Sequence, residues 1–341
     1  MNSGELIARP EQGREAVEVL PPEAPKTITA IAGIPVPRLF AADPRTALRC
    51  AEFFGANIRN PNTRRAYLGD IERFSAWCET HGISDLGRVQ PLHVAAFLED
   101  LLRAVSKPTV KRHLAAIRML CDWLVLGQVL PWNPASVVRG PKHSVKKGKT
   151  AVLSSEEARD LLDSIETSSL AWLRDRALIG VMAYTFARVG AATQMRVEDV
   201  YLQGRRTWVR LHEKGGKRNE MPAHHNLEEY LHAYIAKADL AKKGKEYLFR
   251  TVDWNTGELT DRRMSQADAY RMIRRRARAA GIQTRIGNHT FRATGITAYL
   301  KNGGRMEVAQ QMAGHESART TGLYDRRSDQ VNIDEVERIG I

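Results

Sequence analysis

A basic segment near the middle of the chain most constrains its fold. Residues 139–152, "RGPKHSVKKGKTAV", contain one proline, two glycines and five lysines or arginines, and they interrupt every apolar period. Helical patterns lie on both sides, which favours a basic linker between two domains. At 341 residues the chain is long enough for about two domains. We therefore predict a helical domain over 41–138, a basic linker over 139–152 and a second domain over 153–328.

The first domain is predicted to be all α-helical. Residues 60–82 indicate an amphipathic helix, because four large apolar side chains share one face: Tyr67, Ile71, Phe74 and Trp77. Similar patterns over 90–104 and 106–127 raise the expected total to about four helices. Residues 1–40 mix proline, glutamate and alanine with short apolar pieces and lack a sustained period, which predicts a mobile N-terminal arm.

The second domain is predicted to be mostly α-helical with one small antiparallel sheet. A capping box formed by Ser154 and Glu157 begins its first helix. Residues 173–195 indicate one long, mostly buried helix. Strand patterns are confined to 206–224, where alternating side chains around the turn "KGGK" predict a β-hairpin.

The charge balance favours a polyanionic partner. Lysine and arginine outnumber aspartate and glutamate by 52 to 39, and the first 40 residues hold four basic against five acidic residues, so the excess lies in the folded part. Nucleic acid is favoured over a membrane, although a merely basic soluble protein or a ribosome-like protein fits the same composition. Residues 262–285 contain eight arginines but only one acidic residue, Asp268. Because this charge has one sign, it indicates phosphate contacts rather than a solvated helix face. The eight are Arg262, Arg263, Arg271, Arg274, Arg275, Arg276, Arg278 and Arg285.

Cysteines and apolar runs predict the compartment. The three cysteines, Cys50, Cys78 and Cys121, lie far apart without a CxxC pair, which argues against a disulfide framework or a zinc site and suits a reducing cytosol. No apolar run approaches the roughly 18 to 20 residues of a membrane span, and no secretory signal is visible. We expect a cytoplasmic protein that associates with the nucleoid and makes no membrane contact.

A tyrosine near the end of the chain raises the chemical question. Tyr324 lies nine residues after His315 in "MAGHESARTTGLYDRR". A free phenol has a pKa near 10, so ionising it at neutral pH needs roughly 4 kcal/mol from nearby cations and hydrogen-bond donors. Candidate groups of this kind are Arg188, Lys214, His289, Arg292 and His315. Each is weak evidence alone: Arg188 could form a buried ion pair, and a metal site at the two histidines lacks a further ligand at suitable spacing, so no metal is expected.

Taken in order, these residues resemble a known family. An arginine in "YTFARVGAA", a lysine in a β-turn, "HTFR", and "GH" followed nine residues later by tyrosine are similar to the tyrosine recombinases of the phage integrase, Xer and Cre family, over residues 41–328. The resemblance implies a two-domain DNA clamp, with an N-terminal core-binding, SAM-like domain and a mostly α catalytic domain. It also implies cleavage and rejoining of double-stranded DNA through a 3′-phosphotyrosyl link, without metal or cofactor. The acting form would be a tetramer on paired sites, built from copies of this chain or with related recombinase subunits.

The resemblance assigns a role to each of six residues. Two guanidiniums hold the non-bridging phosphate oxygens, a base deprotonates the phenol and an acid protonates the departing 5′ oxygen. The implied set is Arg188 and Arg292 on the phosphate, Lys214 as acid, His289 as base, His315 as a hydrogen-bond donor to the phosphate, and Tyr324 as nucleophile. Three neighbours depart from the family's commonest pattern: Ala191 replaces an acid, Ala293 a histidine and Phe186 a glycine, which puts the support of the site in doubt.

Further contacts and rival functions complete the expectations. The residues expected to touch DNA are Thr63, Arg64, Lys111, Arg112, Arg271, Arg274 and Arg275. The tail over 329–341 is too short to fold alone and is expected to pack on a neighbouring subunit, with folding back on its own domain as the alternative. A type IB topoisomerase or a telomere resolvase would use the same chemistry. A DNA-binding regulator without catalysis is a rival from another class.

Overall fold

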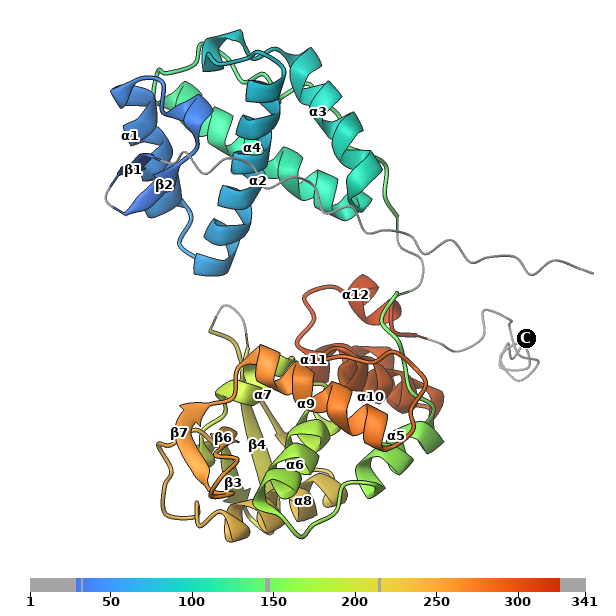
Figure 1. Cartoon of the computed structure of the whole chain (residues 1–341). Helices are drawn as coiled ribbons and strands as arrows, with labels where there is room; N and C mark the ends of the chain where they lie inside the picture. Colours follow the sequence, from blue (N-terminus) through green and yellow to red (C-terminus); the bar gives the residue numbers. More distant parts are fainter. Residues whose placement is uncertain (1–28, 32, 145–147, 214–215, 326–341) are drawn as a thin grey trace, which may run out of the picture. The chain divides into compact units, whose positions relative to one another are not determined.

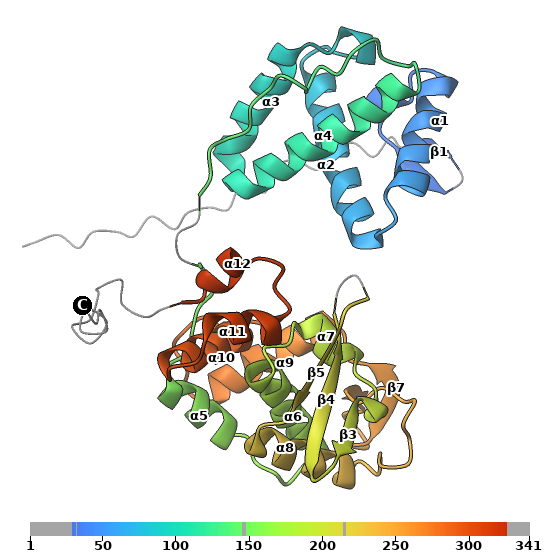
Figure 2. The same cartoon turned by 180° about the vertical axis from the view of Figure 1, so that it is seen from behind.

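The structure is a computed structural model that describes residues 29–31, 33–144, 148–213 and 216–325. The chain divides into two compact units, Met1–Ser144 and Val145–Ile341, and the division falls inside the basic segment at 139–152. Figures 1 and 2 show the elements of each unit from opposite sides. None of the described helices is long and apolar enough to cross a lipid bilayer.

The first unit is a helical domain with a short β-ribbon. Strands β1 (Thr29–Ile31) and β2 (Ile34–Val36) pair antiparallel ahead of the 3₁₀ turn η1 (Arg38–Phe40). Its remaining elements are α1 (Pro44–Glu52), the π-helical η2 (Phe53–Asn57), α2 (Pro61–Thr80), the 3₁₀ turn η3 (Leu86–Arg88), α3 (Pro91–Ala104) and α4 (Lys107–Leu126). All four α-helices have proline in their first turn, where its missing N–H costs no hydrogen bond.

The folded part of the first unit begins earlier than residue 41. Residues 1–28 and 32 of the predicted arm lie outside the described residues. Within 29–40, however, the side chains of Val36, Leu39 and Phe40 are buried in the core, and the Leu39 N–H donates to the hydroxyl of Ser75 at 3.0 Å. A three-residue strand and a single turn are too short to show a period, so sequence alone placed this segment in the arm.

The second unit packs helices around a small sheet. Its elements are α5 (Ser155–Asp163), α6 (Leu170–Tyr184), α7 (Val189–Gln194), η4 (Val197–Asp199), β3 (Val200–Gln203), β4 (Arg206–His212), β5 (Arg218–Pro222), α8 (His225–Lys237), β6 (Arg250–Val252), β7 (Leu259–Arg263), α9 (Gln266–Ala279), α10 (Thr290–Lys301), α11 (Met306–Ala313) and α12 (Ala318–Gly322). Strands β3, β4 and β5 form one antiparallel sheet in that order. The predicted hairpin is therefore present, with Val209 and Leu211 facing the core. The ribbon β6–β7 was not predicted, because its strands are short and charged.

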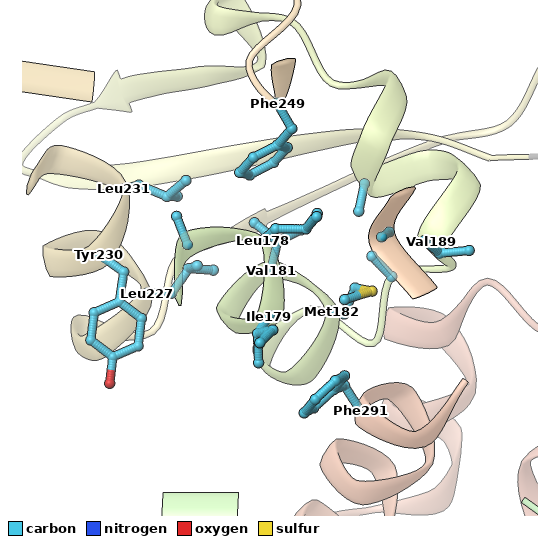
Figure 3. Packing of buried hydrophobic residues seen from close by; sticks show 14 of the residues in the cluster. Leu178, Ile179, Val181, Met182, Val189, Leu227, Tyr230, Leu231, Phe249 and Phe291 are labelled. Carbon is cyan, nitrogen blue, oxygen red and sulfur yellow. The ribbon is translucent and has the colours of Figure 1, made fainter. Parts of the chain in front are cut away.

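Helix α6 is the centre of this unit. Figure 3 shows Leu178, Val181 and Met182 of α6 surrounded by apolar side chains from other elements, among them Leu227 and Leu231 of α8, Phe249 and Phe291. Gly180 lets α8 approach closely, since a Cβ there would lie 3.0 Å from the ring of Tyr230. The capping box that begins α5 is confirmed by both of its hydrogen bonds, Ser154 N–H to the Glu157 carboxylate and Glu157 N–H to the Ser154 hydroxyl.

The prediction of a single long helix over 173–195 is wrong. Helix α6 ends at Tyr184 and α7 begins at Val189, and in the break between them Phe186 adopts a left-handed backbone conformation with φ of 56°. Helix α10 packs directly on this break at Gly295. Any larger residue would clash there, since a Cβ on Gly295 would lie 2.1 Å from the Ala183 carbonyl oxygen and 2.8 Å from the Phe186 ring. The Phe186 carbonyl accepts a hydrogen bond from Arg292 of α10. The break consequently sets Arg188 at the start of α7, a position that periodicity could not reveal.

A buried carboxylate gathers three of the arginines. Asp175 of α6 is fully buried, and one of its oxygens accepts from Arg174 at 2.7 Å. The other oxygen accepts from Arg276 at 2.8 Å and from Arg275 at 3.1 Å. Part of the arginine-rich segment over 262–285 therefore joins α9 to α6.

We predict that Asp175→Asn destabilises the chain strongly. The substitution keeps the shape but leaves buried guanidiniums without a counter-charge, so the free energy of unfolding should fall by about 3–5 kcal/mol. Glu229→Gln is the control, since Glu229 is 70% exposed and lies 3.9 Å from Arg176, and it should cost less than about 1 kcal/mol. Urea unfolding of the full chain measures both, and equal losses would contradict the assignment.

Candidate active site

The guanidinium of Arg292 lies at the centre of the candidate site. Arg292 is 1% exposed on α10, and its Nη1 donates to the carbonyl of Phe186 at the α6–α7 break. Its Nη2 donates to the carbonyl of Ala313 at the end of α11, at 2.6 Å. Gly314 ends α11 in the left-handed conformation with φ of 56°, and the chain then turns to His315. One buried cation thus fixes two distant backbone segments.

A second guanidinium approaches from the start of α7. Nη1 of Arg188 donates to Oε2 of Glu213 at 2.6 Å, and the two side chains are 38% and 5% exposed. Burial, followed by the positive charge of Arg188, lowers the pKa of Arg292 to about 10, while Tyr324 and Glu213 act in the opposite direction. The two arginines are therefore close enough to repel, and the site has the character of an anion-binding cage.

The two histidines line the same cage in their neutral form. His289 immediately precedes α10, and burial and then the charges of Arg292 and Arg188 lower its pKa. His315 is buried, and the same three causes lower its pKa to about 4. Nδ1 of His315 lies 2.9 Å from the hydroxyl of Thr321 on α12. When that hydroxyl donates, the other ring nitrogen carries the proton and can donate to an anion.

Tyr324 lies beside the cage of its own chain. It follows α12, which ends at Gly322, rather than belonging to that helix. Its carbonyl accepts from the Thr297 hydroxyl of α10 at 2.8 Å, and its ring stacks on His315 with centroids 5.7 Å apart and planes 8° apart. The electrostatic effect of Tyr324 on Arg292 places the phenol next to that guanidinium. The nucleophile candidate is thus available in cis.

The β4–β5 hairpin covers one side of this arrangement. Lys214 and residue 215 at its tip lie outside the described residues, so the structure does not place the predicted acid. The flanking residues are placed: Glu213 N–H donates to the Lys217 carbonyl at 2.8 Å, and the Asn219 amide donates to the Met312 carbonyl of α11 at 2.7 Å. The hairpin is consequently tied to the segment that carries His315.

Five of the six predicted catalytic residues are therefore described, and the structure brings them together from segments far apart in sequence. Sequence reasoning missed Glu213, Thr321 and Thr297, which contact Arg188, His315 and Tyr324 respectively. Of these three residues, only Glu213 could have been noticed in the sequence, because it directly precedes the hairpin lysine. Among residues 29–31, 33–144, 148–213 and 216–325, no cluster of three histidine, cysteine, aspartate or glutamate side chains could hold a metal ion.

The residues predicted to touch DNA differ in their availability. In the first unit, Arg112 forms two hydrogen bonds with the buried Asp70 at 2.8 and 2.7 Å, and Arg64 donates to the Ile58 carbonyl at 2.8 Å. In the second unit, Arg271 donates to Asp268 at 2.5 Å, and Arg275 to Asp175. Four predicted contacts are thus already engaged with protein acceptors, whereas Lys111 is exposed and Thr63 and Arg274 are half-buried.

Two family models match the chain. Residues 151–330 match the model described as the phage integrase family, and residues 55–128 match the phage integrase N-terminal SAM-like domain. The tyrosine recombinase XerD of Mycobacterium leprae (strain TN) is 30% identical over 277 residues, which cover 77% of this chain and 86% of that protein.

Solved structures show the same fold. The XerH site-specific recombinase bound to a palindromic difH substrate, in a post-cleavage complex, matches with a TM-score of 0.64 at 20% identity, over 81% of this chain and 79% of that one. A lambda integrase tetramer bound to a Holliday junction matches with a TM-score of 0.62 at 18% identity, over 83% and 78%.

The left-handed backbone at Phe186 predicts an unusual order of stabilities. Phe186→Gly should be more stable than Phe186→Ala by about 1 kcal/mol, because glycine adopts this conformation without strain. At Phe291, which is also buried but lies in α10, the order should be the ordinary one, with alanine more stable than glycine by about 1 kcal/mol. Urea unfolding of the four variants measures this, and the same order at both positions would contradict the role of the break.

The depressed pKa of His315 predicts a pH-dependent stability. Between about pH 4 and about pH 6.5 the unfolded chain binds a proton that the folded chain does not, so the free energy of unfolding should rise with pH across this window. The contribution is about 3 kcal/mol, and it should be absent from His315→Gln. Urea unfolding across that window gives both curves, and parallel curves for the variant and the wild type would refute the assignment.

Proposed function

Because the chain belongs to the phage integrase family, we propose that it is a site-specific recombinase that cleaves DNA by attack of Tyr324 and rejoins the strands through a 3′-phosphotyrosyl link. The observation that carries this proposal is the convergence of Arg188, Arg292 and both histidines beside that phenol. The substrate is double-stranded DNA, which the net charge of +13 suits.

The proposed chemistry follows from the charges that develop. Attack on a phosphodiester spreads negative charge over the non-bridging oxygens, and Arg188 and Arg292 supply planar donors that face those oxygens. A neutral His289 accepts the phenol proton as the Tyr324 oxygen bonds to phosphorus, and Lys214 gives a proton to the departing 5′ oxygen. His315 donates a hydrogen bond to the phosphate. The phosphotyrosyl bond conserves the energy of the broken bond, so a 5′ hydroxyl reverses the step without ATP.

The proposal extends to assembly and setting. We place four copies on two paired sites, alone or with related recombinase subunits; the lambda integrase neighbour is named as a tetramer on a Holliday junction. The tail over 329–341, which lies outside the described residues, is the proposed contact to an adjoining subunit. Of the basic residues predicted to contact DNA, we retain Lys111 and Arg274, because no hydrogen bond or ion pair joins their side chains to the residues that the structure describes. The cytoplasm, where the nucleoid lies, is the proposed setting because its DNA is the substrate.

Covalent trapping in cells tests the function. The wild-type chain should be recovered joined to DNA, and sequencing of the attached strand should return one site. Tyr324→Phe should fold and bind that DNA but give no adduct, because the attacking oxygen is absent. Tyr299→Phe is the matched control, since Tyr299 packs in the same apolar cluster, and its adduct yield should remain within about twofold of wild type.

Two outcomes would redirect the proposal. An adduct from Tyr324→Phe would show that another residue is the nucleophile. Rejoining of only the original strand, with no exchange between two recovered sites, would favour the topoisomerase. EDTA should leave cleavage of the recovered site unchanged, because the cage supplies the positive charge from side chains.

A further inference from the structure

A carboxylate lies inside a site whose other charged groups are cationic. Glu213 is the last described residue of the hairpin before Lys214, its side chain is 5% exposed, and it accepts a hydrogen bond from Arg188 at 2.6 Å. Burying a carboxylate is costly unless it is paired. A negative group beside a phosphate-binding cage would weaken binding unless it contributes something else, so its presence calls for a role.

The geometry of the Glu213–Arg188 contact suits a carboxylate that orients the guanidinium better than one that blocks it from a phosphate. Glu213 binds Arg188 through Nη1 alone, and no other hydrogen bond joins that guanidinium to the residues that the structure describes. A guanidinium has five N–H donors, so most of them stay available for a phosphate. Arg292 is held in a comparable way, by two backbone carbonyls. Both arginines are thus anchored by acceptors while they keep further donors.

The electrostatics of Arg292 provide independent support. Its charged form is disfavoured by burial and by Arg188, and Glu213 is one of the groups that favour it. Glu213 therefore acts on both guanidiniums: it binds one directly and reduces the repulsion felt by the other. Without this carboxylate, two cations would face each other in a largely buried site before DNA arrives.

The sequence around Arg188 shows why the carboxylate comes from the hairpin. Helix α7 begins after Arg188, and its third residue is Ala191, a position from which an acidic side chain can reach the backbone N–H of the residue preceding the helix and so lie beside Arg188. In the family that the chain resembles, an acid often stands at this position. The alanine leaves α7 without a partner for Arg188, and Glu213 occupies that role from a different element.

We propose that Glu213 is a positioning residue that orients Arg188 toward the scissile phosphate, supplying from the β4–β5 hairpin the carboxylate that α7 lacks. This inference rests on the proposed function.

The experiment compares single-turnover cleavage of the recovered DNA site by three variants of the full chain. Glu213→Gln, which keeps shape and removes charge, should slow formation of the Tyr324 adduct about 10- to 100-fold, with DNA affinity within about twofold of wild type. Ala191→Glu in the Glu213→Gln background should restore at least about tenfold of that loss, because it places a carboxylate at the start of α7, beside Arg188. Glu220→Gln, which removes an exposed partner of Arg210 in the same hairpin, should cleave at the wild-type rate.

Each other outcome would overturn the inference. Wild-type cleavage by Glu213→Gln would show that orientation does not depend on the carboxylate, and faster cleavage would show that Glu213 competes with the phosphate. Failure of Ala191→Glu to restore any activity, with circular dichroism and DNA binding unchanged, would exclude replacement of the α7 acid. Absence of an adduct from wild type and Glu220→Gln alike would contradict the proposed function itself.

Discussion

The buried guanidinium of Arg292 is the interaction on which the catalytic unit depends. It bonds the carbonyl at the α6–α7 break and the carbonyl that ends α11, so a single side chain connects segments separated by more than a hundred residues. Those two segments carry Arg188 and His315. The close packing of Gly295 on the break brings α10 near enough for this bond. The group that we propose to bind the scissile phosphate therefore also holds together the two segments that carry Arg188 and His315.

The balance of charge explains the protonation states within the cage. Burial and two guanidiniums keep His289 and His315 neutral, which suits one to accept a proton and the other to donate a hydrogen bond. Glu213 offsets part of the repulsion between the arginines before DNA supplies its own negative charge. Because Glu213 engages only one nitrogen of Arg188, the other N–H donors of that guanidinium remain for an anion.

Much of the fold and site could be predicted from sequence, and the failures share a cause. The order and spacing of arginine, histidine and tyrosine predicted the chemistry because each residue type has a definite role in phosphoryl transfer. Periodicity located α2, α3 and α4 of the first unit and the hairpin of the second, but it gave no range for α1. It missed the break at Phe186, because the left-handed backbone there is stabilised by Gly295 and Arg292, which are remote in the chain. It missed the role of Glu213 for the same reason: burial of that carboxylate depends on how the hairpin packs.

Hydrogen exchange of Arg292→Lys tests the central claim most directly. A lysine retains the charge but lacks the planar fork that reaches two carbonyls. We predict that amides around residues 185–189 and 311–316 exchange at least about tenfold faster than in the wild type, while those of β3 and β4 keep their wild-type rates. Unchanged exchange at both segments would show that they are held without Arg292 and would contradict the account.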